Sequence, residues 1–127
     1  MEYVMGDQGF SIQLEYDELH ISGDSKTGFR PYQLLVSSIA GCSGLVLKKI
    51  LDKQRINVDD IRIRADVTRA EGGANEVRKI HLVYHIKGKE LNAAKIEKAL
   101  ALSRKYCPMI QSVAGSIEVT ESFELGR

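Results

Sequence analysis

The sequence has no tryptophan and only two prolines, and its charges nearly cancel. Because 18 basic and 17 acidic side chains are interspersed and give a formal net charge of +1, the chain lacks the one-signed field that nucleic acid or an anionic membrane would require. It also has only two cysteines, and its first residues carry acids but no lysine or arginine, unlike a secretory signal. We therefore expect a reducing, cytoplasmic location and no framework of structural disulfides.

Long uncharged runs and low-complexity segments are absent as well. The uncharged run Tyr32–Leu47 is shorter than the roughly 20 residues that a membrane span needs, so we expect no membrane partner. What the chain does have is an ordinary globular composition, with 43% hydrophobic and 28% charged residues among 127. These values predict a single domain, residues 1–127, that is large enough to enclose a hydrophobic core.

The first part of the chain predicts a small sheet followed by a long helix. Apolar residues alternate with polar ones at Ile12, Leu14 and Tyr16, which is the pattern of a strand in an antiparallel meander. Pro31 suits the first turn of a helix, and no breaker other than two glycines follows before about Gln54. Because a helix that is apolar all round is buried all round, we expect this helix to be central, covered by sheet or by sheet and a second subunit.

The second part predicts a hairpin, a bent helix and a last strand. Alternating apolar residues indicate two strands at 61–68 and 80–87. Asn92 is a good N-cap for the next helix, and Pro108 disfavours helical backbone at the residue before it, so a short new helix begins there. A final strand lies within 117–123. This order of elements predicts an α+β domain.

The two cysteines lie in unlike settings. Cys107 precedes the start of a helix, where unpaired N–H groups favour negative charge, and Arg104 and Lys105 add positive potential, so its thiolate has local support. Cys42 is expected in the middle of the long helix, where no free N–H points at it. A buried cysteine alone is more often a small hydrophobic side chain than a nucleophile. A redox function therefore requires that the fold bring the two sulfurs together.

Two histidines share a spacing that is typical of metal ligands on a helix. His81 and His85 are four residues apart, but the alternating pattern around them indicates a strand. Their Cα atoms would then lie about 13 Å apart, which is too far for one ion. We therefore expect no metal site.

Two segments resemble one known protein family. The run from Pro31 to Cys42, PYQLLVSSIAGC, resembles the central-helix motif of the OsmC/Ohr proteins, the osmotically inducible and organic hydroperoxide resistance proteins. The run from Leu102 to Pro108, LSRKYCP, resembles the second cysteine motif of that family, and residues 117–125 resemble its closing strand. The two cysteines are about 65 residues apart, and the resemblance covers nearly the whole chain.

The resemblance implies an OsmC-like α+β fold in which antiparallel sheets wrap around long central helices in an intertwined homodimer, with the site at the subunit interface. A thiolate at Cys42 would attack a small organic hydroperoxide, and the resulting sulfenic acid would condense with Cys107 to form a disulfide. The resemblance implies no bound cofactor. An external dithiol, lipoyl in the well-studied members, would reduce the disulfide as the protein's redox partner.

The chain departs from the family at the residues that activate the thiol. Well-characterised members pair an arginine from the N-terminal strands with a glutamate at the start of the central helix. Here residues 1–29 contain no arginine, and no acid lies between Gly28 and Leu51. Arg30 is the candidate substitute, but about 18 Å of helix separates it from Cys42, and its side chain spans roughly 7 Å. Arg30 could therefore act on this cysteine only if a dimer places the Arg30 of a second subunit beside it, which we take as a hypothesis.

Three further residues are candidates for the substrate pocket. Gly41 and Gly44 flank Cys42 and leave room for a substrate or another backbone, although they would equally serve close packing of the helix on a sheet. Tyr32 lies near the expected mouth of the pocket, where it either donates a hydrogen bond or simply packs.

Three functions are open at this point. The first is thiol-dependent reduction of organic hydroperoxides, with Cys42 as the peroxidatic and Cys107 as the resolving cysteine; the opposite assignment is also open, because Cys107 has the better local support. The second is an OsmC-like protein that binds a small apolar or thiol-reactive ligand at the dimer interface without turnover, which the missing arginine and glutamate favour. The third is a structural subunit whose cysteines are core residues.

Overall fold

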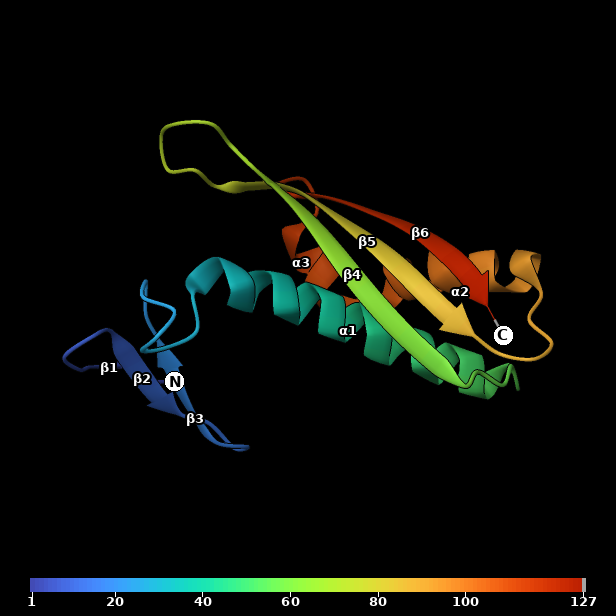
Figure 1. The fold of residues 1–127 in the computed structure, drawn as a ribbon, viewed down its shortest axis with the longest axis horizontal. Helices are drawn as coiled ribbons and strands as arrows, with labels where there is room; N and C mark the ends of the chain where they lie inside the picture. The colour runs from blue at the N-terminus through green and yellow to red at the C-terminus, as the bar shows by residue number, and fades with distance from the viewer. Residues whose placement is uncertain (127) are drawn as a thin grey trace. The chain divides into compact units, whose positions relative to one another are not determined.

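The computed structural model describes residues 1–126 and has the α+β architecture that the sequence predicts (Figure 1). In chain order its elements are β1 (Val4–Met5), β2 (Phe10–Gln13), β3 (Glu18–Ile21), α1 (Pro31–Lys53), β4 (Asp60–Arg69), β5 (Val77–Lys87), α2 (Ala93–Tyr106), α3 (Pro108–Val113) and β6 (Glu118–Gly126). The sequence predicts a single domain, and the chain forms two compact units, Met1–Ser37 and Ser38–Arg127. The division falls inside α1.

The first unit contains an antiparallel sheet in the order β1-β2-β3, as the meander pattern predicts. The loop after β3 is held by Ser22, whose hydroxyl donates to the Gln8 carbonyl at 2.7 Å. One detail of the prediction is wrong. Strand β2 ends at Gln13, and the chain turns where the Leu14 amide donates to the Asp17 carbonyl at 3.1 Å. Tyr16 therefore lies in a turn and is fully exposed, because the turn ends the alternation before this residue.

The second unit contains a sheet in the order β4-β5-β6. Strands β4 and β5 form the expected antiparallel hairpin, but β5 and β6 are parallel. This corrects the expectation of purely antiparallel sheets. Because α2 and α3 lie between β5 and β6 in the chain, they carry it back along the sheet, and a parallel pair requires such a crossover connection (Figure 1).

The core of the second unit lies between this sheet and one stripe of each long helix. The stripes are spaced by three and four residues, as one helix face requires. The fully or nearly fully buried members are Ile80, Leu82, Tyr84 and Ile86 on β5, Ile39, Ser43, Leu47 and Leu51 on α1, and Ile96, Ala99, Leu100 and Ser103 on α2. Each buried leucine or isoleucine contributes about 1.5–3 kcal/mol relative to an exposed one, so this layer dominates the stability of the unit.

The long helix α1 is buried along one face only within the single chain. Leu45, on another face, is 70% exposed, so the prediction of burial all round is not met by this chain alone. By length and apolar composition α1 also meets the criterion for a membrane span, and only 28% of its most apolar window is buried within this chain. The expectation that no segment could span a membrane was based on uncharged residues alone, and it is not met because a window with a few charges also qualifies. A core helix meets the same criterion.

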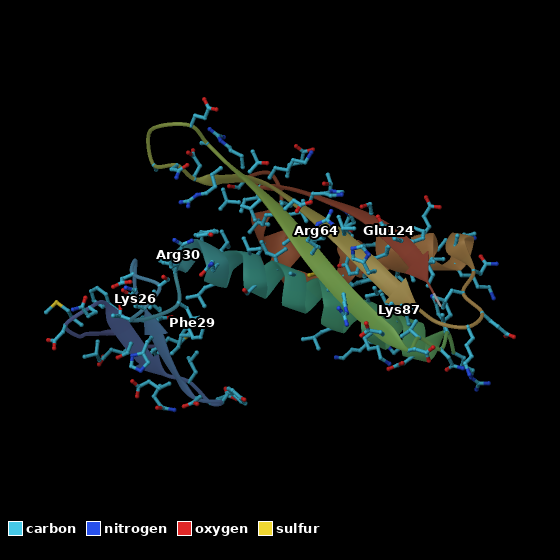
Figure 2. All side chains as sticks on the ribbon, in the orientation of Figure 1. Lys26, Phe29, Arg30, Arg64, Lys87 and Glu124 are labelled. Atoms are coloured by element: carbon cyan, nitrogen blue, oxygen red, sulfur yellow. The ribbon has the colours of Figure 1, made fainter. Side chains whose placement is uncertain are left out.

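The helix that follows the hairpin begins and ends where the sequence predicts. The Asn92 side chain caps α2 by accepting from the Lys95 amide at 3.1 Å. The helix ends at Tyr106, and Cys107 has extended backbone (φ −82°, ψ 110°) before Pro108 starts α3. The opposite face of the sheet is polar, with the Arg64 and Glu124 side chains projecting from β4 and β6 (Figure 2). Cys107 therefore lies at the corner between α2 and α3.

Replacing Gly9 by alanine is expected to disrupt the sheet of the first unit. A Cβ atom at Gly9 would lie 2.0 Å from the Ile21 carbonyl oxygen, so β2 and β3 would have to separate. We expect a loss of about 1–3 kcal/mol in the stability of this unit, measured by amide hydrogen exchange in β2 and β3. Gly23→Ala is the matched control, because nothing lies within 4 Å of its Cβ position. Equal exchange in both variants would contradict the expected clash.

Candidate functional site

The structure brings the two cysteines together, although they are far apart in the sequence. Cys42 lies in the middle of α1 and is partly exposed, whereas Cys107 is fully buried at the junction of α2 and α3. Both are free thiols, and their side chains are close enough to share a hydrogen bond. The convergence on which a thiol redox function depends is therefore present within one chain.

The surroundings of Cys107 keep its thiol protonated. Burial raises the pKa of Cys107, and backbone N–H groups of Ile110 and Met109 only partly oppose this effect. The hydrogen bond to Cys42 and the charge of a Cys42 thiolate raise the pKa of Cys107 further. The predicted local support for a Cys107 thiolate is therefore wrong in its net direction, because the sequence showed the helix start but not the depth of burial.

The two cations before Cys107 are engaged elsewhere. Lys105 lies over the Tyr106 ring, with its Nζ atom 5.5 Å from the ring centroid. The Arg104 guanidinium donates to the Val119 carbonyl, and its Nε atom lies 3.2 Å from Glu121 Oε1. Neither contact is with the thiol, so the positive potential that the sequence suggested at Cys107 is directed to other groups.

A buried polar group adjoins the cysteines. The Ser43 and Tyr84 hydroxyls share a hydrogen bond, and both side chains are fully buried. Burial raises the pKa of Tyr84 well above its usual range, the hydrogen bond from Ser43 opposes this, and the charges of Glu121 and Cys107 add to it. Burial also raises the pKa of Glu121, whereas Arg104 and Tyr84 lower it. We call Ser43, Tyr84, Glu121 and Arg104 the polar chain.

Sequence reasoning missed the polar chain, although two signals for it were present. Glu121 alternates with Val119 and Phe123, so an acid occupies a position on the core-facing side of β6. Tyr84 falls among the apolar residues of β5, and a buried tyrosine hydroxyl normally has a hydrogen-bond partner. Both signals say that a polar group is buried, but only the fold shows that these groups meet.

The two glycines beside Cys42 have different surroundings. A Cβ atom on Gly44 would lie 2.8 Å from Ile63 Cδ1 on β4, so Gly44 allows close packing of the helix on the sheet. Nothing lies within 4 Å of the Cβ position on Gly41, which is exposed. The sequence allowed either interpretation for both glycines. Gly44 serves close packing of the helix on the sheet, whereas Gly41 leaves open space next to Cys42.

Arg30 and Tyr32 contact each other in the first unit. The Arg30 guanidinium donates to the Tyr32 hydroxyl at 2.8 Å and lies 5.0 Å from the centroid of its ring. Arg30 Nε is buried and has no hydrogen-bond partner within the part of the chain that the structure describes. Figure 2 shows Arg30 where the chain enters α1. Tyr32 thus both packs and accepts a hydrogen bond, and it orients the arginine.

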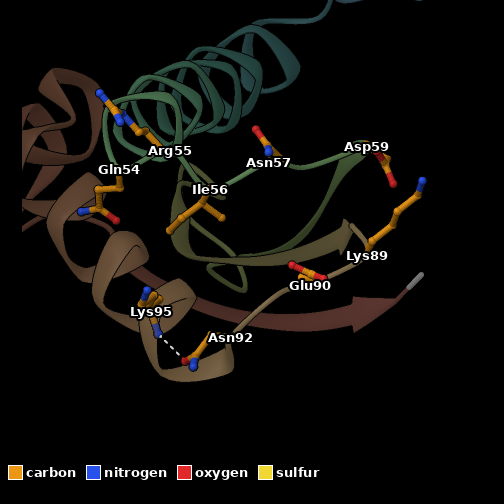
Figure 3. A pocket seen from close by; sticks show the side chains of 9 residues that line it. All are labelled: Gln54, Arg55, Ile56, Asn57, Asp59, Lys89, Glu90, Asn92 and Lys95. Atoms are coloured by element: carbon orange, nitrogen blue, oxygen red, sulfur yellow. Dashed lines mark hydrogen bonds between the residues drawn. The ribbon is translucent and has the colours of Figure 1, made fainter.

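A polar cavity of about 430 Å³ has no cysteine among its lining residues (Figure 3). It is formed where α1 ends and α2 begins, and it is lined by Gln54, Arg55, Ile56, Asn57, Asp59, Lys89, Glu90, Asn92 and Lys95. Its lining mixes cations with acids and includes no cysteine. We therefore place the thiol chemistry elsewhere.

A second, more apolar groove of about 420 Å³ is lined by residues of α1 and α2. Val46 lies one turn after Cys42, and Tyr106 immediately precedes Cys107. Its remaining lining residues are Lys49, Ile50, Lys53, Gln54 and Leu102. The groove is therefore largely apolar, and its lining includes the residue before Cys107 in the sequence.

The histidines have partners other than a metal ion. His81 hydrogen-bonds with the Thr120 and Ser122 hydroxyls at 2.6 and 3.0 Å, and His85 lies 3.2 Å from Glu124. Among residues 1–126, no group of three or more histidine, cysteine, aspartate or glutamate side chains is arranged to hold a metal ion.

Comparison with known proteins gives one family. The family described as OsmC-like protein matches residues 23–122 of this chain. The Escherichia coli K12 protein YhfA is 28% identical over 105 residues, which are 82% of this chain and 77% of YhfA.

Solved structures share the whole fold. A hypothetical protein from Aquifex aeolicus VF5 superposes with a TM-score of 0.87 at 29% identity, over 98% of this chain and 93% of that one. An organic hydroperoxide resistance protein OsmC from Legionella pneumophila superposes with a TM-score of 0.73 at 18% identity, over 98% and 97% of the two chains. The last likeness shows the fold alone.

The two cysteines are expected to differ in their rate of alkylation. In a Cys42→Ser variant the remaining Cys107 is buried with a raised pKa, so little of it is thiolate at neutral pH, and iodoacetamide should modify it at least about tenfold more slowly than Cys42 in Cys107→Ser. Its rate should rise only above the usual range of thiol pKa values. Mass spectrometry across about pH 6 to 10 measures both rates. Urea-unfolded samples are the control, and equal rates in the folded variants would refute the assignment.

Proposed function

This chain belongs to the OsmC-like protein family, and on that premise we propose that it reduces organic hydroperoxides with the thiol pair Cys42 and Cys107. The observation that carries the proposal is the proximity of these two thiols, one partly exposed and one buried, inside a single chain. The name of the Legionella relative, an organic hydroperoxide resistance protein, supports this substrate class.

Cys42 is the sulfur that attacks the peroxide. It is the more accessible of the two, whereas Cys107 is enclosed and keeps its proton. The Cys42 thiolate attacks the terminal oxygen of the hydroperoxide, the O–O bond breaks, and the leaving alkoxide takes a proton to become an alcohol. Cys42 is thereby oxidised to a sulfenic acid. The Cys107 thiol supplies a hydrogen-bond donor beside the reacting sulfur.

Cys107 then resolves the sulfenic acid. Its sulfur attacks the Cys42 sulfur, the S–O bond breaks, and the Cys107 proton leaves with the hydroxyl group as water. A second thiol so close to the first captures the sulfenic acid before further oxidation. An external dithiol or lipoyl-type reductant, with no bound cofactor, restores both thiols by thiol–disulfide exchange.

We also propose that the working unit is a homodimer. The largely apolar groove between α1 and α2 and the exposed side chains of Leu45, Leu102, Tyr106 and Met109 support this proposal. A second copy of the chain would cover this groove and these side chains, which accounts for the apolar character of α1 on faces that are open here. Arg30 of the second subunit is then the candidate cation for Cys42, and Tyr32 and Gly41 are candidates for the pocket wall.

A binding function without turnover is the second candidate. It is favoured by the missing arginine and glutamate, since residues 1–29 contain no arginine and no acid lies between Gly28 and Leu51. In that case a small apolar or thiol-reactive ligand would occupy the dimer interface, and the cysteines would remain reduced in the presence of peroxide.

Thiol titration separates the two functions. With one equivalent of cumene hydroperoxide, the reduced protein is expected to lose both of its thiols within seconds to minutes and to gain one intramolecular disulfide, because Cys107 lies beside Cys42. Free-thiol assay and mass spectrometry measure this outcome. Unchanged thiols would reject the peroxidase and support the binding protein.

Single cysteine variants test the roles of the two thiols. Cys107→Ser should stop at a sulfenic acid on Cys42 that dimedone traps, whereas Cys42→Ser should not consume peroxide. The reverse pattern would assign the attack to Cys107.

A charge on the exposed face of α1 is expected to prevent dimerisation. Leu45→Glu places a carboxylate on the apolar surface, where burying it would cost several kcal/mol, so the variant should sediment as a monomer and lose peroxide turnover. Thr68→Glu on the polar face of β4 is the control and should remain dimeric. A wild-type chain that sediments as a monomer at micromolar concentration would overturn the proposed dimer.

A further inference from the structure

A buried acid lies next to the thiol pair and has no role in the chemistry described above. The Glu121 side chain is 8% exposed and projects from the core-facing side of β6. Its Oε1 atom pairs with Arg104, while its Oε2 atom is buried and has no hydrogen bond of normal geometry among residues 1–126. Because buried polar atoms normally find partners, an acceptor with spare capacity next to a reactive pair calls for an explanation.

The polar chain connects the two elements that carry the cysteines. At one end Ser43, the neighbour of Cys42 on α1, hydrogen-bonds with Tyr84. At the other end Arg104, in the last turn of α2 before Cys107, binds Glu121 and the Val119 carbonyl. Tyr84 lies between, and the charges of Glu121 and Cys107 both raise the pKa of its hydroxyl. The polar chain therefore begins at Ser43, the residue after Cys42, and ends at Arg104, three residues before Cys107.

We propose that Glu121, acting through the Tyr84 hydroxyl, is a positioning residue that sets how readily Cys107 gives up its proton during disulfide formation. The inference rests on the proposed function of the cysteine pair and deepens it. Arg104 holds the carboxylate in place through Oε1 and leaves Oε2 able to accept a proton.

During disulfide formation the Glu121 carboxylate accepts a proton and later gives it back, so it ends in its starting state. As the Cys107 sulfur bonds to the Cys42 sulfur, its proton moves toward the Tyr84–Glu121 pair, and the S–O bond of the Cys42 sulfenic acid breaks. The leaving hydroxide takes a proton back and becomes water. Cys107 is oxidised and Cys42 is reduced by one step each, and the organic hydroperoxide supplied the oxidising equivalents earlier.

The pH dependence follows from the groups that face Glu121. These are Arg104 from α2, which favours its charged form, and Tyr84 from β5, which in turn faces Cys107. Burial outweighs them and raises the pKa of Glu121. The proton-accepting form is therefore lost as pH falls through this raised pKa, and disulfide formation should slow over the same range.

Stopped-flow measurement of the two steps tests the inference. Glu121→Gln keeps the shape of the side chain and removes its charge. We expect sulfenic acid formation on Cys42 to be unchanged and disulfide closure at neutral pH to slow by about tenfold or more, so that dimedone traps more sulfenic acid. The acidic limb of the closure rate against pH should disappear. A structural role alone would not remove this limb.

Matched variants separate this effect from loss of folding. Glu124→Gln changes an exposed acid on the same strand, paired with His85, and should leave both steps unchanged. Glu121→Asp keeps a carboxylate and should restore part of the rate and the acidic limb. Tyr84→Phe removes the intermediate hydroxyl and should slow closure as Glu121→Gln does. Closure in Glu121→Gln with the wild-type rate and pH profile would overturn the proposal.

A second oxidant keeps the test independent of the peroxidase proposal. Diamide forms an adduct with one thiol, and attack by the second thiol displaces a hydrazine and closes the same disulfide without peroxide. If the wild-type protein ignores hydroperoxide but closes with diamide, and Glu121→Gln closes about tenfold more slowly, the proposed function fails and the role of Glu121 stands. If both proteins close at equal rates with diamide, the role of Glu121 is rejected whatever the peroxide result.

Discussion

The hydrogen bond between the Ser43 and Tyr84 hydroxyls fastens the long helix α1 to the middle of β5. Both groups are fully buried, and leaving either without a partner would cost about 1–3 kcal/mol, so the two must meet in the folded state. This requirement sets the rotation of α1 about its axis. With Ser43 facing β5, Ile39 and Leu47 face the sheet one turn to either side, and Cys42 is directed toward the corner that holds Cys107.

Much of this arrangement could be predicted from local signals in the sequence. Pro31 and Asn92 begin the two long helices where their chemistry suggests, and Pro108 breaks the second helix at Cys107. Hydrophobic alternation located the hairpin of β4 and β5. The parallel pairing of β6 could not be read, because alternation shows which residues share a face but not which way a strand runs.

The protonation of the thiols depends on how far each side chain is buried, and a local sequence pattern does not show this. The helix start at Pro108 correctly indicated N–H groups near Cys107, but burial outweighs them, so the buried thiol is the one that keeps its proton. Glu121 was visible as an acid among apolar positions of β6, yet its partner Arg104 lies on another element. The prediction for Tyr16 was wrong for a different reason. A turn ends the alternation of β2 before this residue, so Tyr16 does not lie in the strand.

The parallel pairing of β5 with β6 also bears on how the protein folds. Paired residues such as Lys79 and Glu118 are about 40 positions apart, so docking of β6 must close a long loop that contains two helices. Glu121 arrives with that strand. The hairpin of β4 and β5 joins neighbours in the chain, whereas the contact of Ser43 on α1 with Tyr84 on β5 spans 41 positions, so α1 too must close a long loop to reach its place. The polar chain is therefore complete only when both of these long-range contacts, α1 with β5 and β5 with β6, have formed.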